Sequence, residues 1–502
     1  MSKNKVDILL VGAGVMSATL GMLLSRLDPD LKILMVERLS KVAGESTHSL
    51  NNAGTGHAGY CELNYTPEKA DGSVEINKAL AINAGFEVSL QFWSWLVEQG
   101  LLPASHEFIN SIAHQSFVWG DKDVAFLRKR YELLHKHHLF EEMEYSEDHA
   151  VLNEWMPLIM KDRDPKQKVA ATQVKHGSDI DFGSLTKHLI KSLKKHPNFE
   201  LQLGHSIENL KQQTNGQWKV SIKDRHTETS HAYEAGFVFL GAGGGALPLL
   251  QKAGLPESKG YGGFPVSGQW LICKNPEIVK KHRTKVYGRA PSGSPPMSVP
   301  HLDSRIIDGK PALIFGPYAG FTTKFLKEGS IFDLFNSVKP GNLKPMLAVA
   351  FDNMDLTRYL LKGTMQSHKE RVSNLANFYI DANEKEWSLE SAGHRVQIIK
   401  SCDAKGGKLE FGTETITSKD GTLAALLGAS PGASISVQAM IEVLECCFKK
   451  QIKSADWKHK IKEMIPSYGE SLDENVELLH TIRHRTRTIL GLDLSNSKRK
   501  HI

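Results

Sequence analysis

The chain has 502 residues, a length that accommodates two or three domains. Hydrophobic residues make up 40% of it and charged residues 24%, and the longest apolar stretches fall far short of the ~20 residues of a membrane-spanning helix. This composition is that of a soluble globular protein and excludes an integral membrane protein. The net charge of +6 would suit an anionic substrate or anionic lipid headgroups, or carry no functional meaning.

The N-terminus and the cysteines indicate the compartment. No signal peptide precedes the first predicted strand, and the five cysteines show neither metal-ligand spacing nor a paired framework. The pattern suits a reducing cytoplasm, so we expect a cytoplasmic protein, and no metal site is predicted.

The first segment of the chain has the pattern of a βαβ unit. Residues 6–11 predict a buried strand, an apolar helix follows through Leu27, and residues 32–37 predict a second strand that ends on the acid Glu37. The helix N-terminus offers unpaired N–H groups and a partial positive charge to phosphates. Glu37 can accept hydrogen bonds from an adenosine ribose, so the unit predicts dinucleotide binding.

The turn between the first strand and the helix carries an imperfect GxGxxG motif. Gly12 would allow the tight turn, and Gly14 would let the backbone approach a pyrophosphate. The third position is Ser17, which is small enough for the close packing of helix on strand that this position requires. The alternative is a glycine-rich turn in another α/β fold.

Residues 44–59 form a glycine- and hydroxyl-rich loop directly after the ribose acid. This segment resembles the one that passes under the flavin ring in FAD-dependent oxidoreductases of the D-amino-acid oxidase and L-2-hydroxyglutarate dehydrogenase type. The positions that match are Ser46, Asn52, Gly54, His57 and Gly59. The resemblance implies FAD and disfavours an NAD-dependent dehydrogenase.

The middle of the chain alternates helices and strands. Residues 75–100 and 128–138 predict helices, and residues 177–186 cap a helix that runs to about residue 195. Strands are predicted at 200–203, 217–223 and 233–240, with a turn at 214–216. The last of these strands runs into residues 241–245, where Gly243 resembles a second FAD contact of this class or marks a generic strand-to-helix turn.

The last third of the chain contains a proline-rich loop at 291–300, a strand and turn over 313–324, and a final glycine-rich run. That run holds Gly428, Ser430 and Gly432 and precedes a helix predicted at 435–448. Glycine and serine at a helix N-terminus favour an anion or carbonyl site. In the flavoprotein class, this loop places a helix N-terminus at the flavin pyrimidine.

These elements predict an α/β protein with a discontinuous, Rossmann-like FAD-binding domain of the glutathione-reductase/D-amino-acid-oxidase type and an α+β substrate domain. The predicted FAD-binding domain comprises residues 1–75, 171–259 and 391–502. The predicted substrate domain comprises residues 76–170 and 260–390.

Nearly the whole chain resembles FAD-dependent malate:quinone oxidoreductases. The segments that carry the resemblance are STHSLNNAGTGH (46–57), ELNYTP (62–67), SVPHLDSR (298–305), FGPYAGFTTKF (315–325), RVQIIK (395–400) and LLGASPGAS (426–434). The chain departs from the family pattern at His394, where Gln is expected, and at Tyr60 and Cys61.

This resemblance implies oxidation of (S)-malate to oxaloacetate by hydride transfer to FAD. The electrons then pass to a membrane quinone, which links the tricarboxylic acid cycle to the respiratory chain. It further implies a malate dehydrogenase (quinone) bound peripherally to the cytoplasmic face of the inner membrane, with no nucleic acid partner.

Oxidation of a secondary alcohol requires a base for the hydroxyl proton and an acceptor for the hydride at the same carbon. A neutral imidazole suits the first task because its pKa lies near working pH. His57, in the loop expected against the flavin, is the first candidate for the base, and His301, close to Arg305, is the second. Either histidine could instead be a core residue that the backbone satisfies.

A dicarboxylate substrate also requires cations, and arginine is preferred because its planar fork matches a carboxylate. Arg305 and Arg395 are the predicted clamps, with Lys324 as a third cation, although each could be a surface ion pair. Gln269 resembles the segment at which chains of this class turn into the substrate domain beside the flavin.

Two other functions remain open on the sequence alone. The first keeps the fold and the cofactor but changes the substrate to another 2-hydroxy acid, such as L-2-hydroxyglutarate, or to an amino acid. The second is a flavin-fold protein without catalysis that acts as a binding module. The intact glycine loops, His57 and both arginines argue against the second.

Overall fold

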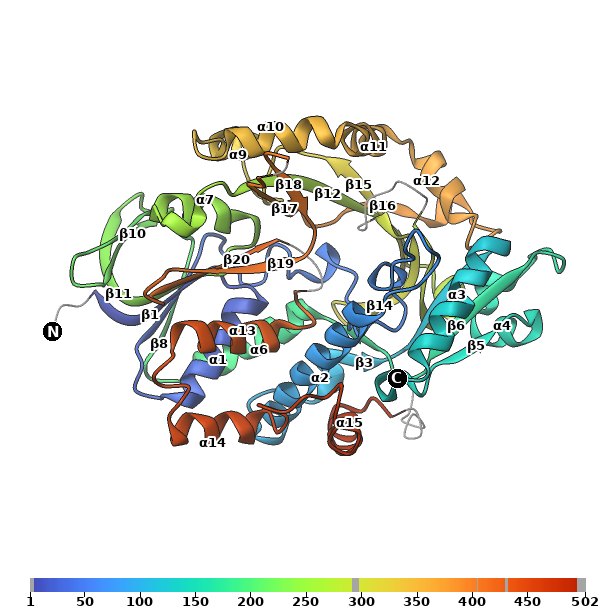
Figure 1. The fold of residues 1–502 in the computed structure, drawn as a ribbon, viewed down its shortest axis with the longest axis horizontal. Helices are drawn as coiled ribbons and strands as arrows, with labels where there is room; N and C mark the ends of the chain where they lie inside the picture. Colours follow the sequence, from blue (N-terminus) through green and yellow to red (C-terminus); the bar gives the residue numbers. More distant parts are fainter. Residues whose placement is uncertain (1–3, 291–297, 404, 429–431, 494–502) are drawn as a thin grey trace.

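The computed structural model describes residues 4–290, 298–403, 405–428 and 432–493. Two large sheets dominate it, and helices surround them (Figure 1). The arrangement confirms the predicted α/β class.

The first sheet has the strand order β19-β20-β11-β1-β2-β8, and β10 pairs with β11 and with β9. The pairs formed by β1, β2, β8, β11 and β20 are parallel, while β19, β9 and β10 pair antiparallel. The strands span Lys5–Val11 (β1), Ile33–Glu37 (β2), Phe199–Leu203 (β8), His205–Gln212 (β9), Trp218–Asp224 (β10), Ser230–Leu240 (β11), Thr413–Thr417 (β19) and Leu423–Gly428 (β20).

Strand β1 is apolar and buried from Ile8 to Val11, where both faces of the sheet are covered. Ile8 and Leu10 point into one hydrophobic cluster, and Leu9 and Val11 point into another. The first cluster is formed with helices α1 (Val15–Leu27), α6 (Phe182–Leu193) and α13 (Ser436–Cys447), and the second with α7 (Ala246–Ala253). This double cover holds the end of β1, where the predicted turn lies, in a rigid frame.

The second sheet has the order β18-β17-β12-β15-β14-β13-β4-β6-β5, with β16 beside β12, and its strands are antiparallel except for the β13–β4 pair. They span Ala113–Trp119 (β4), Glu144–Ser146 (β5), Val169–Val174 (β6), Gly262–Cys273 (β12), Thr284–Tyr287 (β13), His301–Ile307 (β14), Lys310–Phe321 (β15), Ser388–Ser391 (β16), Arg395–Lys400 (β17) and Lys408–Glu410 (β18). A short ribbon pairs β3 (Ile109–Ser111) with β7 (Ser178–Ile180).

The remaining helices surround this core. They are α2 (Asn77–Glu98), α3 (Asp121–Leu134), α4 (His149–Trp155), α5 (Pro157–Met160), α8 (Pro276–Val279), α9 (Asp333–Ser337), α10 (Leu343–Asp352), α11 (Met354–Met365), α12 (His368–Leu375), α14 (Ala455–Met464) and α15 (Val476–Leu490). Helices α9, α10 and α11 follow one another along the upper edge of the view (Figure 1).

Most predicted elements are present close to their predicted bounds, including the βαβ unit, the helix at 75–100 and the helix after the final glycine run. The helix predicted at 128–138 is wrong in position, since α3 spans Asp121–Leu134. Asp121 and Asp123 in its first turn favour an early start because they complement the helix dipole. Residues 291–297 of the predicted loop lie outside the described residues. The domain boundaries stay a prediction.

Candidate active site

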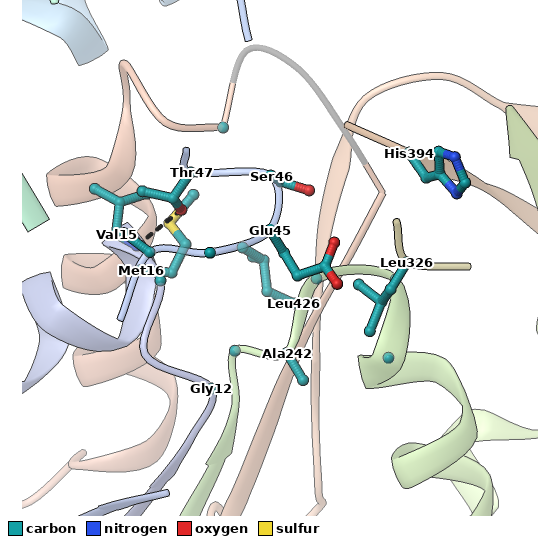
Figure 2. Close-up of a pocket in the computed structure, with 18 of the residues that line it drawn as sticks. Gly12, Val15, Met16, Glu45, Ser46, Thr47, Ala242, Leu326, His394 and Leu426 are labelled. Atoms are coloured by element: carbon teal, nitrogen blue, oxygen red, sulfur yellow. Dashed lines mark hydrogen bonds between the residues drawn. The ribbon is translucent and has the colours of Figure 1, made fainter. Parts of the chain in front are cut away.

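A cavity of about 410 Å³ lies where the glycine turns after β1 and β11 meet the loop that follows β2 (Figure 2). It is lined mainly by apolar groups and glycines, with a few polar side chains. The predicted cofactor residues that line it are Gly12, Gly14, Glu37, Ser46, Asn52, Gly54, Gly243, Gly428 and Gly432. The sequence-predicted dinucleotide contacts therefore come together from four distant segments.

The turn after β1 requires glycine at its first position. Gly12 has a φ of +93°, and a Cβ there would lie 2.7 Å from the Gly241 carbonyl oxygen. Glu37 closes the same turn, because its carboxylate accepts hydrogen bonds from the N–H groups of Ala13 and Leu39, each at 2.8 Å. The acid at the end of β2 is thereby held at the cavity wall, where it can accept further hydrogen bonds.

Ser17 does not line the cavity. It is fully buried in α1, and its Oγ would lie 2.3 Å from a Cβ added at Gly241. Its role is close packing of the helix against the second glycine turn, as expected for the third position of the motif.

Asn52 organises the loop that follows Glu45. Its side-chain amide donates to the carbonyl oxygens of Ser46, Thr47 and His48, and its Oδ1 accepts from the Gly54 N–H at 2.9 Å. Figure 2 shows Thr47 turned toward Val15, whose N–H donates to the Thr47 hydroxyl at 3.2 Å. The loop is therefore tied to the N-terminus of α1 and lies along the cavity as one rigid piece.

Gly54 packs directly on Arg305. A Cβ at Gly54, which has a φ of +59°, would lie 2.2 Å from Nη2 of that arginine. The Arg305 side chain is fully buried, ion-pairs through Nε with Asp179 at 2.7 Å, and donates to the Asn52 carbonyl at 2.8 Å. It lines neither this cavity nor the next one, so the prediction that Arg305 clamps a substrate carboxylate is corrected. It instead donates to backbone carbonyls of residues 46–54, which we call the flavin loop.

A second cavity, of about 220 Å³, adjoins the first and shares Asn52, Ala53, His57 and Arg395 with it. Both predicted candidates for the base, His57 and His301, line this second cavity. The two histidines come from elements more than two hundred residues apart in the chain, and the fold brings them to one place.

His57 is paired with the buried carboxylate of Glu62 through Nδ1. Burial alone would raise the pKa of Glu62, but the neighbouring His57 outweighs this effect and holds that pKa below its usual range. The backbone N–H of His57 donates to Ser434 Oγ at 3.0 Å, and the Ser434 hydroxyl donates to the Thr55 carbonyl. These bonds join the loop that holds His57 to the segment that leads into α13, while Glu62 orients the imidazole.

His301 is paired with Asp303, whose Oδ2 lies 2.8 Å from Nδ1. The ring of His301 stacks on Tyr287 at 4.2 Å and meets the edge of Trp270. Burial would raise the pKa of Asp303, but His301 and Lys285 hold it below its usual range. Each histidine therefore has a carboxylate that fixes one ring nitrogen and leaves Nε2 to exchange a proton.

Arg395 lines both cavities. It donates to the carbonyl oxygens of His394 at 3.1 Å and Asn51 at 2.7 Å, and no ion pair with a carboxylate is found for it among the described residues. Burial lowers its pKa to about 10, so an anion bound beside it would relieve the cost of the desolvated charge. Lys78 is a second cation at the second cavity, and burial lowers its pKa too.

Three other predicted residues lie elsewhere. Lys324 lines neither cavity and sits beside His394. Gln269 accepts a hydrogen bond at 2.8 Å from Arg371 and does not line either cavity, whereas its neighbours Gly268 and Trp270 line the second one. The place of Gln269 beside the flavin stays a prediction. Ser430 lies outside the described residues.

Sequence reasoning missed Glu62, Lys78, Asp303 and Gln397. Glu62 and Asp303 stand in segments that carried the family resemblance, five and two residues after the two histidines, and this spacing was a usable signal. The sequence around Lys78 in α2 contains no such signal. Gln397 in β17 is buried and lines the second cavity, and its side-chain oxygen has no hydrogen-bond partner among the described residues.

The part of the chain that the structure describes contains no group of three or more histidine, cysteine or carboxylate side chains that could hold a metal ion. It also contains no helix that is both long and apolar enough to cross a membrane.

The family model described as malate:quinone oxidoreductase (Mqo) matches residues 4–492 of the chain. A probable malate:quinone oxidoreductase from Hahella chejuensis is 64% identical over 494 residues, which cover 98% of this chain and 99% of the relative. A probable malate:quinone oxidoreductase 1 from Pseudomonas putida is 55% identical, with all of both chains covered.

Solved structures resemble the fold at low sequence identity. L-alpha-glycerophosphate oxidase from Mycoplasma pneumoniae, solved with FAD bound, has a TM-score of 0.60 at 15% identity and covers 90% of this chain and 97% of its own. Glycine oxidase from Geobacillus kaustophilus has a TM-score of 0.58 at 13% identity, covering 90% and 96%. These similarities establish the fold alone.

Proposed function

The chain belongs to the malate:quinone oxidoreductase family, and we propose that it oxidises (S)-malate to oxaloacetate and passes the electrons to a membrane quinone. The structural observation that carries the proposal is the pair of adjoining cavities. One has the features of a dinucleotide site, the other gathers two histidine–carboxylate pairs and two cations, and His57 and Arg395 line both.

The first cavity fits FAD. Gly12 and Gly14 leave room for a pyrophosphate at the N-terminus of α1, Glu37 offers its carboxylate to a ribose, and the loop from Ser46 to Gly54 lies along the wall. Bound FAD supplies the acceptor for the hydride that leaves C2 of the substrate. The remaining tasks of binding, orientation and proton removal fall to side chains of the chain.

His57 is the base that removes the hydroxyl proton in this proposal. It lies at the boundary of the two cavities, and Glu62 holds its Nδ1, so Nε2 takes the proton. The adjacent carboxylate stabilises the imidazolium that forms. His301 with Asp303 lines the substrate side alone, and we assign it to hydrogen bonding of the substrate oxygen rather than to proton removal.

Arg395 and Lys78 bind the two carboxylates of the substrate in this proposal. Arg395 stands where the two cavities meet, so it binds the carboxylate next to the reacting carbon, and Lys78 binds the distal one. A C4 dicarboxylate requires both cations, whereas a monocarboxylate would leave one of them unpaired. The presence of two cations therefore favours the dicarboxylate malate over the monocarboxylate lactate.

The proposed quinone acceptor requires the protein to work at a membrane. A quinone of the respiratory chain is lipid-soluble, so we propose peripheral attachment to the cytoplasmic face of the inner membrane. Sedimentation of the native protein with membranes, and its release by high salt or mild detergent, would support this location.

The proposed reaction is tested by the flavin spectrum. We expect the purified protein to be yellow and to bleach rapidly under anaerobic conditions with (S)-malate, but not with L-2-hydroxyglutarate or L-lactate. A soluble quinone should restore the colour. Bleaching by another acid would refute the substrate and keep the fold, and a yellow protein bleached by none of the acids would refute catalysis.

A further inference from the structure

Exposed apolar side chains gather on one segment of the molecule. Among the described residues, every large hydrophobic side chain that is at least 50% exposed lies between residues 331 and 365, on or next to α9, α10 and α11. These residues, which we call the apolar ridge, are Ile331, Phe332, Phe335, Leu347, Phe351 and Met365. The three helices form the upper edge of the molecule in Figure 1.

The ridge is not needed to hold its own helices in place. Helix α10 buries Pro345 and Val349 against the protein, while Leu347 and Phe351, one turn apart, point outward. Helix α11 is seated by Gly363, where a Cβ would lie 2.2 Å from the Ala319 carbonyl oxygen. A helix that is apolar on its inner and outer faces requires a second partner, and contiguous exposed apolar surface marks an interaction site.

Cations accompany the apolar side chains. Lys339, Lys344, Arg358 and Lys362 belong to the same segment, as do the acids Asp333, Asp352 and Asp355. Arg358 is ion-paired with Asp355 at 3.2 Å, and the Asp333 carboxylate is engaged by backbone N–H groups, so the three lysines carry the positive charge that is left for a partner. Apolar side chains next to lysine and arginine are the composition of helices that lie in the headgroup layer of an anionic bilayer.

The ridge helices also pack on the strands of the second cavity. Val266 of β12 and Ala319 of β15 line that cavity, and both belong to a hydrophobic cluster with Val349 of α10 and Leu360 of α11. A surface that meets lipid at the ridge would therefore bring the bilayer next to the walls of the proposed active site.

We propose that the apolar ridge on α9, α10 and α11 is the membrane-docking surface, and that its occupant is an anionic phospholipid bilayer. The inference rests on the proposed function, because a quinone acceptor explains why the protein must meet lipid. A two-fold contact between copies of the chain is the competing use of an exposed apolar surface, and the test below distinguishes it from lipid binding.

The test is flotation of the purified, full-length protein with vesicles of phosphatidylethanolamine and phosphatidylglycerol. The variant is Leu347→Glu/Phe351→Glu, and both substituted side chains are exposed, so folding should be retained. The matched control is Leu133→Glu/Val476→Glu, which adds the same charge at exposed apolar residues of α3 and α15, away from the ridge (Figure 1). Malate oxidation with a soluble dye acceptor is measured for each protein.

We expect wild type and control to float with these vesicles, and the ridge variant to lose roughly tenfold or more of its vesicle partition, since apolar insertion is lost and carboxylates meet anionic headgroups. Dye-linked activity should be unchanged in all three proteins. Replacing phosphatidylglycerol with phosphatidylcholine should weaken binding of the wild type.

Three outcomes would overturn the docking surface. They are equal flotation of the ridge variant and wild type, no flotation of wild type, and a wild-type dimer that the ridge substitutions convert to a monomer without any vesicle binding. Failure of the proposed function has a different signature, because a protein that floats through the ridge but shows no dye-linked activity with malate would keep the surface and lose the reaction.

Discussion

The contact between Gly54 and Arg305 gives the sharpest test of how the flavin loop is held. Replacing Gly54 with alanine places a Cβ within 2.6 Å of three atoms of the Arg305 guanidinium group. Gly100 provides a matched control, because its φ of +66° is close to the +59° of Gly54, yet nothing lies within 4 Å of its added Cβ. The two substitutions share the backbone cost and differ in the steric one.

The expected magnitudes follow from these contacts. Alanine in the left-handed region costs about 1–2 kcal/mol at either position. At Gly54, the guanidinium group must also leave Asp179 and the Asn52 carbonyl, and breaking a buried ion pair costs about 3–5 kcal/mol. We therefore expect Gly54→Ala to lose about 4–7 kcal/mol of unfolding free energy, against about 1–2 kcal/mol for Gly100→Ala.

Urea unfolding followed by circular dichroism measures both variants, and flavin absorbance per protein measures how much FAD each retains. Gly54→Ala should unfold at much lower urea and retain little flavin, because the loop that lines the first cavity is displaced. Gly100→Ala should keep its flavin. Equal midpoints and equal flavin content in the two variants would refute the idea that the loop rests on an immobile Arg305.

Three further predictions concern the second cavity and the core. Glu62→Gln should lower kcat for malate by about a hundredfold or more, because Glu62 positions His57. KM and flavin content should be nearly unchanged, and Glu62→Asp should restore part of the activity. An unchanged kcat would show that Glu62 has no part in catalysis. Arg395→Met and Lys78→Met should each raise KM for malate by roughly ten- to a hundredfold, which corresponds to the binding free energy of one charge-assisted hydrogen bond. A variant with wild-type KM would identify a cation that does not contact the substrate. Burial lowers the pKa of His282 to about 4 from 6.5, so between these values the unfolded chain binds a proton that the folded chain does not. His282 should consequently account for a fall of up to about 3 kcal/mol in the unfolding free energy from pH 6.5 to pH 4, and the buried His114 adds to the same slope. His282→Gln should therefore reduce the slope in urea titrations, whereas an identical slope would contradict the assignment.

Local chemistry made the first cavity predictable. The turn at Gly12, the packing position at Ser17 and the acid at Glu37 depend on residues that are close in sequence, and each constrains the backbone or a neighbouring group in a way that spacing reveals. The glycine-rich loop was recognisable for the same reason. Ser17, which replaces the usual third glycine, fits the same rule because this position requires only a small side chain.

The alternation of side chains along a strand limits what the sequence predicts about the second cavity. Gly268 and Trp270 line that cavity, and Gln269 between them turns to Arg371, so a motif that marks the right strand still leaves the face undetermined. Lys78 was missed for a related reason. It lies on a long helix whose apolar pattern shows which face is buried, but not that one exposed lysine stands at the mouth of a cavity formed by other segments.

The backbone of the flavin loop explains why Arg305 is predicted from the sequence to be a substrate clamp. Residues 46–53 run through the interior without pairing in a sheet, so their carbonyl oxygens need donors from elsewhere. Asn52 serves the carbonyls of residues 46, 47 and 48, Arg395 serves residue 51, Arg305 serves residues 49 and 52, and Lys285 serves residue 53. These three cations lie more than two hundred residues away in the chain, and the sequence alone predicts the two arginines to be substrate clamps. Cations near a glycine-rich flavin loop thus have two uses, and among these three cations of the described chain, Arg395 reaches both the loop and the cavities and is placed for both.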